Sequence, residues 1–92
     1  MTEDAYELIV ARQAARAIAG TLPEAVSAAV TDFITGSLIE NPRRVGRELR
    51  NELAGIHSAR RGSYRILYRI DESERTVTVL RIDHRGDVYR TT

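Results

Sequence analysis

The chain contains no cysteine and no tryptophan, and its fourteen basic residues are all arginine. Without cysteine, disulfides and thiolate-bound metals are excluded. The apolar runs are only a few residues long, far short of the about 20 residues that a membrane-spanning helix needs. The N-terminal sequence MTEDAYE is acidic, whereas a signal peptide begins with basic residues. We therefore expect a cytoplasmic protein that has no membrane partner.

The 92 residues are 42% hydrophobic and 29% charged, a balance typical of a globular protein rather than a disordered one. This length predicts a single domain over residues 1–92, with a thin core. The net charge of +1 hides an asymmetry, because residues 1–40 hold two arginines and six acids, whereas residues 41–92 hold twelve arginines and seven acids. A basic second half favours a polyanionic partner.

The first forty residues are predicted to form one strand and two helices. Residues 6–11 (YELIVA) are apolar and β-branched, which is typical of a strand. Apolar side chains then recur with helical spacing over residues 11–22 and again over residues 23–39. Thr21 and Glu24 have the spacing of a capping box, which places the start of the second helix between them.

The remaining residues are predicted to form most of a sheet. The basic connector after Pro42 leaves open a turn of helix or a short strand. Residues 56–61, 63–70 and 76–83 are predicted to be strands, and DESER (71–75) is predicted to be a hairpin turn. The fold class is therefore α+β: an N-terminal strand, a two-helix hairpin, and an antiparallel sheet of three to four strands covered on one face.

Alternation with a period of two assigns a face to each side chain in these strands. In residues 63–70, four side chains are expected to face the core: Tyr64, Ile66, Tyr68 and Ile70. Three are expected on the open face: Arg65, Leu67 and Arg69. In residues 76–83, the same alternation groups Val77 with Val79 and assigns Ile82 to the opposite face.

Arginines gather in the C-terminal strands and at their ends: Arg60, Arg61, Arg65, Arg69, Arg81 and Arg85. Guanidinium groups bind phosphate oxygens, and the tyrosines between them offer surfaces on which bases stack. This combination is typical of nucleic-acid binding. The pattern leaves open whether each arginine is a phosphate ligand or a solvated residue.

Few side chains in the sequence are candidates for proton transfer or metal binding. Imidazole is the side chain that ordinarily titrates near neutral pH, so His57 and His84 are candidates for proton transfer, although a lone histidine is more often structural. Asp83, His84 and Asp87 in DHRGD could act as hard metal ligands. Most other acids lie far from them in the sequence, so we expect no metal and no other cofactor.

Two sequence blocks stand out in the basic half: LRNELAGIHSARRGSYRILYRID and DHRGDVYR. The first contains Gly-x-Tyr-Arg followed by two hydrophobic residues and a second tyrosine. Together with the predicted β-α-α-β-β-β order, these blocks resemble the RelE/ParE superfamily of bacterial toxins, and within it the RelE branch. The resemblance covers nearly the whole chain.

The resemblance implies the toxin of a type II toxin–antitoxin pair that cleaves mRNA in the ribosomal A site. Its partners would be a cognate antitoxin, the ribosome and mRNA, and it would reach operator DNA only within the antitoxin complex, as a co-repressor. In the implied reaction the ribose 2′-OH attacks the adjacent phosphorus, without a metal or another cofactor.

The resemblance also implies roles for single residues. Arg65 matches the arginine that contacts the scissile phosphate, Arg85 one that stabilises the transition state, and Tyr89 a tyrosine that orients a base. The other arginines of the cluster would bind RNA: Arg60, Arg61, Arg69 and Arg81. Typical RelE toxins carry lysines before the Tyr-Arg motif and this chain has none, so His57 and His84 become the candidates for the general base.

Two alternative functions stay open. The ParE branch poisons DNA gyrase with the same scaffold, although the presence of Arg65, Arg85 and Tyr89 together favours the RelE branch. A catalytically weak homologue that acts mainly as an antitoxin-dependent co-repressor would be consistent with the missing lysines.

Overall fold

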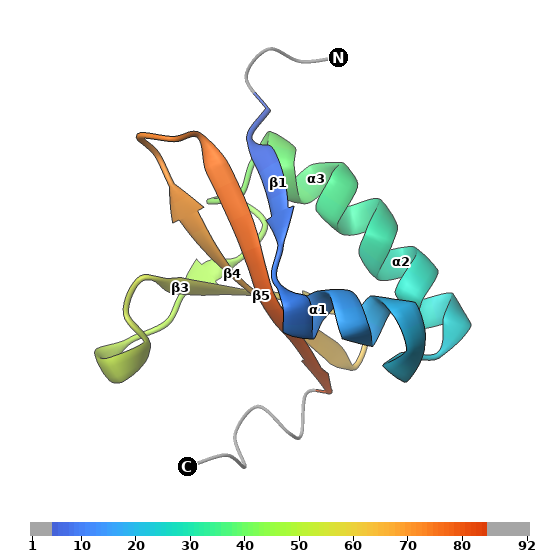
Figure 1. Ribbon diagram of the computed structural model, residues 1–92. Coiled ribbons are helices and arrows are strands. Elements are labelled where there is room, and N and C mark those ends of the chain that lie inside the picture. The colour runs from blue at the N-terminus through green and yellow to red at the C-terminus, as the bar shows by residue number, and fades with distance from the viewer. Residues whose placement is uncertain (1–4, 85–92) are drawn as a thin grey trace.

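The computed structural model describes residues 5–84 and consists of a sheet with helices packed on one of its sides (Figure 1). The elements in chain order are β1 (Glu7–Val10), α1 (Arg12–Arg16), the π-helical turn η1 (Ala17–Thr21), α2 (Glu24–Thr35), α3 (Ser37–Glu40), β2 (Arg47–Glu48), the 3₁₀ turn η2 (Asn51–Leu53), β3 (Ile56–Arg61), β4 (Tyr64–Asp71) and β5 (Thr76–His84). This arrangement confirms the predicted α+β class and the order of its elements.

The sheet has five strands in the order β1-β5-β4-β3-β2. The four strands after the helices pair antiparallel, as predicted. The N-terminal strand β1 pairs with the last strand, β5, in parallel, so the whole sheet is mixed. Parallel strands cannot be joined by a tight hairpin and need a long connection. The helices between β1 and the later strands form part of that connection.

The start of α2 differs from the prediction. Thr21 still belongs to the π-helical turn, and the backbone N–H of Leu22 donates to the Ala17 carbonyl at 2.9 Å. Pro23 is the N-cap of α2, and no side chain caps this end. The predicted capping box between Thr21 and Glu24 is therefore wrong, because the π-helical turn holds Thr21 before the position from which its hydroxyl could act.

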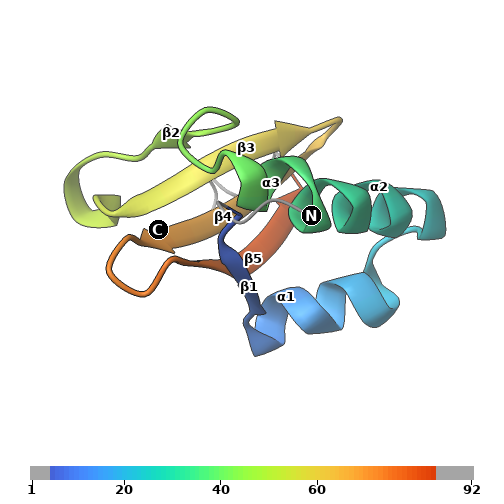
Figure 2. The same ribbon diagram turned by 90° about the horizontal axis from the view of Figure 1, so that it is seen from above.

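The second predicted helix is divided in two. The dihedral angles of Gly36, φ −125° and ψ −94°, end α2 at Thr35, and α3 follows after this break (Figure 2). A Cβ atom at Gly36 would lie 3.1 Å from the carbonyl oxygen of Asp32, a closer approach than most side chains make. No helix within residues 5–84 combines the length and the apolar character that crossing a membrane requires.

The core lies between β3, β4 and β5 on one side and the helices on the other. Its members include Val30, Phe33, Ile34 and Leu38 from the helices and Ala59, Ile66, Tyr68, Val77, Val79 and Ile82 from the sheet. Ile66 and Tyr68 have no exposed surface, and Tyr64 packs against the same cluster. The predicted inward face of β4 is confirmed.

The prediction for Ile82 is wrong, and a bulge in β5 is the reason. Leu67 pairs with Arg81 and Tyr68 pairs with Val79, so Leu80 is an extra residue with no partner in β4. One extra residue reverses the alternation of a strand. Ile82 therefore joins Val77 and Val79 in the core instead of facing away from them.

Candidate nucleic-acid interface

The face of the sheet that the helices leave open carries a group of arginines. Side chains alternate along β4, so Arg65 and Arg69 face away from the core that contains Ile66 and Tyr68. Arg60 is directly opposite Arg65 on β3 and shares its face. Arg81, opposite Leu67, lies on the same open side. Four of the arginines predicted to bind RNA or phosphate thus share one surface.

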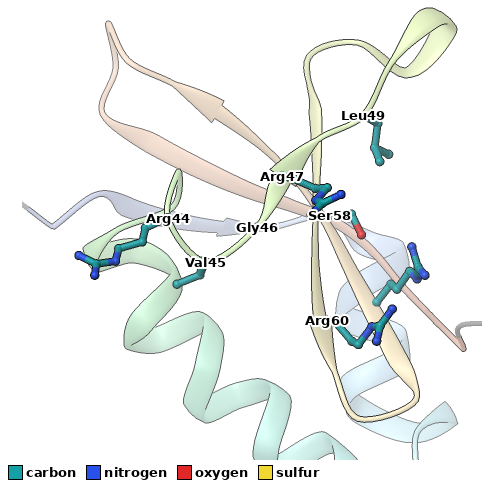
Figure 3. Close-up of a pocket in the computed structure, with 8 residues that line it drawn as sticks. Arg44, Val45, Gly46, Arg47, Leu49, Ser58 and Arg60 are labelled. Carbon is teal, nitrogen blue, oxygen red and sulfur yellow. The ribbon is translucent and has the colours of Figure 1, made fainter.

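A hollow of about 560 Å³ opens on this surface beside Arg65. Its lining consists of Arg44, Val45, Gly46, Arg47, Leu49, Ser58, Arg60 and Arg65. Half of these residues are arginine and none is acidic. In Figure 3, the side chains of Arg47 on β2 and of Ser58 and Arg60 on β3 lie along these two strands, whereas the side chain of Arg44 extends away from them. We call this hollow the basic hollow.

The connector after Pro42 brings Arg47 to the basic hollow. The hydroxyl of Tyr68 donates a 2.6 Å hydrogen bond to the Pro42 carbonyl, which ties the start of the connector to the core. Gly46 then passes so close to β3 that a Cβ atom there would lie 2.7 Å from the Ser58 carbonyl oxygen. In the short strand β2, Arg47 pairs with Ser58 and therefore shares the open face.

On the β5 side of the open face, unlike in the basic hollow, an acidic residue lies beside the arginines. Asp83 is opposite Arg65, and one of its carboxylate oxygens lies 2.7 Å from Nε of Arg81. The two groups form an ion pair without an aligned hydrogen bond. The Asp83 side chain is only 13% exposed, so this negative charge offsets Arg81 in a partly dehydrated position.

Arg61 does not lie with the other arginines of the cluster. Its guanidinium carbon is 3.6 Å from the centroid of the Phe33 ring, on the helix-covered side of the sheet. This geometry is a cation–π contact. The alternation around Ala59, which is buried, is the sequence signal that could have separated Arg61 from Arg60.

The two histidines also lie on the helix-covered side. His57 is buried and stacks on Tyr68, with ring centroids 5.4 Å apart. Its Nδ1 atom has no hydrogen-bond partner within residues 5–84, and burial lowers the pKa of His57. His84 is exposed and makes an edge contact with the ring of Tyr64. The structure does not bring either imidazole together with Arg65 on the open face.

The sequence of the chain matches known toxins. The family model described as the ParE toxin of the type II toxin–antitoxin system parDE matches residues 6–89. Toxin RelG of Mycobacterium tuberculosis is 58% identical over 69 residues, which cover 75% of this chain and 79% of that protein. Toxin RelE of the same organism is 44% identical over 85 residues, covering 92% of this chain and 87% of the relative. The chain belongs to the RelE/ParE superfamily of type II toxins.

The fold of this toxin agrees with a solved relative. The crystal structure of the toxin–antitoxin complex RelBE2 from Mycobacterium tuberculosis contains a chain that superposes with a TM-score of 0.83 and 49% sequence identity. The match covers 88% of this toxin and 99% of that chain. The predicted resemblance to the superfamily, including its RelE-like members, is confirmed.

Several site residues predicted for the toxin lie outside the described residues 5–84, namely Arg85, Tyr89 and the candidate metal ligand Asp87. Within the described part, no three side chains of the types His, Cys, Asp and Glu come together in a group that could hold a metal. Asp83 is engaged with Arg81 instead.

Sequence reasoning missed Arg47 and Ser58 as site residues of the toxin. Arg47 lies in the connector that the sequence left undecided, and a strand of two residues is too short to show a period. Ser58 has the same spacing from Arg60 that places both on one face of β3, so that alternation was the available signal.

Proposed function

We propose that this toxin is a ribosome-dependent mRNA endonuclease of the RelE type. The observation that carries the proposal is the basic hollow, in which arginines from β2, β3 and β4 converge without an acidic neighbour in its lining. A phosphodiester is the substrate group that such a site attracts most strongly. The RelE and RelG names of its curated relatives support the same proposal.

In the proposed reaction the ribose 2′-OH attacks the adjacent phosphorus, and the 5′-oxygen of the next nucleotide leaves. Negative charge grows on the phosphoryl oxygens as the new bond forms. The guanidinium of Arg65, half-buried on β4, would stabilise that charge electrostatically. Arginine stays protonated in proteins and does not act as the base, so the proton of the 2′-OH must go to another group.

A cognate antitoxin is the partner we propose for this toxin. The similar RelBE2 structure is a toxin–antitoxin complex. The basic open face predicts that the antitoxin contributes acidic residues, because they would neutralise the arginines and block RNA from the same surface.

Inhibition of DNA gyrase is the second candidate function, because the matching family model is that of ParE. One experiment separates the two. Primer extension on a reporter mRNA after induction of the toxin alone should show cuts confined to translated codons, while supercoiling by purified gyrase should be unaffected.

Two variants connect this experiment to the site. Arg65→Ala should abolish the cuts while the circular dichroism spectrum stays that of the wild type, because an open-face side chain contributes little to the core. Arg12→Ala removes an exposed arginine of α1 and should cut like the wild type. Intact mRNA together with inhibited supercoiling would instead assign the toxin to gyrase.

A further inference from the structure

The arginines of the open face fall into two groups that differ in charge balance. On the β5 side, Arg81 is paired with Asp83. On the β2 and β3 side, within the part of the chain that the structure describes, no carboxylate pairs with the side chain of Arg47 or Arg60. The positive charge that no described carboxylate offsets therefore lies on the β2 and β3 side of the basic hollow, at Arg47 and Arg60.

The pairing of β2 with β3 brings the two arginines of this side close together. Arg60, on β3, is opposite Arg65 on β4. Arg47 pairs with Ser58, two residues before Arg60 on the same face, so Arg47 is a diagonal neighbour of Arg60. An anion bound between Arg47 and Arg60 would reduce the repulsion of these two like charges, which favours anion binding at this place.

We propose that Arg47 and Arg60 form a second phosphate subsite, which binds the phosphate group next to the one at Arg65. The inference rests on the proposed function for the role of Arg65. The ligand class is single-stranded RNA with at least two consecutive phosphates. Guanidinium contacts with phosphates carry no base information, so the subsite contributes affinity and register rather than codon preference.

The dimensions of the hollow fit more than one phosphate group. Neighbouring strands lie about 4.8 Å apart, so the β2 and β4 backbones are separated by about 10 Å at this place. The volume of about 560 Å³ is within the range of sites that hold ligands larger than a single small anion. The half-buried side chain of Leu49 adds an apolar group to the same lining, against which a sugar or a base can pack.

The test compares ligands that differ by one phosphate. A 2′-deoxy dinucleoside monophosphate carries one phosphate, a 2′-deoxy trinucleoside diphosphate carries two, and neither can be cleaved by 2′-OH attack. Each is titrated into the ¹⁵N-labelled full-length toxin while the arginine Nε–H resonances are recorded by NMR. The wild type should bind the two-phosphate ligand more tightly.

Arg47→Ala should lower the affinity for the two-phosphate ligand about fivefold, the effect of one exposed ion pair. The affinity for the one-phosphate ligand should stay unchanged. The slope of log K against log[salt] for the two-phosphate ligand should become shallower by about 0.7. Arg47→Lys should restore most of that slope. The control Arg12→Ala should change neither affinity nor slope.

Equal weakening of both ligands by Arg47→Ala would overturn the second subsite, because all the arginines would then serve one phosphate. No effect on either ligand would also overturn it. The proposed function can fail separately: a toxin that binds the two-phosphate ligand through Arg47 but leaves mRNA intact in primer extension would retain the subsite and lose the endonuclease assignment.

Discussion

Tyr68 connects the buried and the open sides of the sheet through a single side chain. Its ring is fully buried and stacks on His57, and burial raises the pKa of its hydroxyl to about 12. The hydroxyl donates to the Pro42 carbonyl at 2.6 Å, at the start of the connector that carries Arg47. A core residue thereby helps to position a charged residue of the open face.

Tyr68→Phe should destabilise the toxin by about 1–2 kcal/mol, because it leaves the Pro42 carbonyl without its buried donor. Urea unfolding followed by circular dichroism measures this difference. Tyr64→Phe is the matched control and should change the free energy of unfolding by less than about 0.5 kcal/mol. A Tyr68→Phe toxin as stable as the wild type would show that water replaces the lost hydrogen bond.

His57 predicts a pH dependence of stability. Burial lowers its pKa in the folded state, so the unfolded chain takes up the proton first as the pH falls below about 6.5. Folding stability should therefore decrease from about pH 7.5 to about pH 5. In His57→Phe, which keeps a ring against Tyr68 but cannot titrate, this decrease should be smaller.

The comparison is made between free energies of unfolding measured by urea at both pH values. His84→Phe, which removes the exposed histidine, should keep the wild-type pH dependence. If His57→Phe lost as much stability as the wild type over this range, the titration of another group would account for the decrease.

At the scale of elements, the position of β2 depends on the close approach of the connector to β3 at Gly46. A Cβ atom at Gly46 would meet the carbonyl of Ser58 and the hydroxyl of Tyr68. Gly46→Ala should therefore destabilise the toxin by about 1–3 kcal/mol, the usual effect of inserting an atom into a packed site. It should also weaken the two-phosphate ligand, because β2 and Arg47 would shift.

The control for Gly46→Ala is Gly20→Ala, in the π-helical turn η1. No atom lies within 4 Å of a Cβ built at Gly20, so alanine there should be neutral or stabilising by up to about 1 kcal/mol. Thermal unfolding of both variants gives the comparison. A Gly46→Ala toxin with wild-type stability and ligand affinity would mean that the connector adapts without moving β2.

At the scale of the whole molecule, Glu72 joins three segments that are distant in sequence. The Tyr6 hydroxyl, before β1, donates to both carboxylate oxygens of Glu72, at 2.8 and 3.0 Å. Arg43, after α3, donates to the same carboxylate at 2.7 Å. Arg75 makes a longer ion pair with Glu72 at 3.6 Å, and its guanidinium lies over the Tyr6 ring. We call this group the Glu72 cluster.

Glu72→Gln should lower the melting temperature modestly at low salt, and the difference from the wild type should shrink at about 1 M salt, because exposed charges are screened. The hydrogen bonds from Tyr6 and Arg43 lower the pKa of Glu72. The stability that ionised Glu72 contributes is therefore present above the pKa of glutamate in the unfolded chain, about 4.3. This stability is lost as the pH falls through the lower pKa of Glu72 in the folded state. Scanning calorimetry at two salt concentrations tests this; a difference independent of salt would indicate lost packing instead.

The order of the elements and the inward face of β4 could be predicted because they depend on local periodicity. Ile66 and Tyr68, which are buried, alternate in the sequence with the charged residues Arg65 and Arg69, so charge marks outward positions of this strand. Arg60 and Arg65 were identified for the same reason, since charge on alternate positions indicates an open face. The RelE-like motif then connected these residues with a superfamily.

By itself, the sequence determined the α+β class and the basic open face, because residue periods and charges are local properties of the chain, and its RelE-like motif indicated the superfamily. Only the tertiary structure decided which face each strand end presents and which arginines meet. The bulge at Leu80 moved Ile82 into the core. Arg47 joined the basic hollow through a strand of two residues. Such outcomes depend on pairing between segments far apart in sequence, and no local pattern records that pairing.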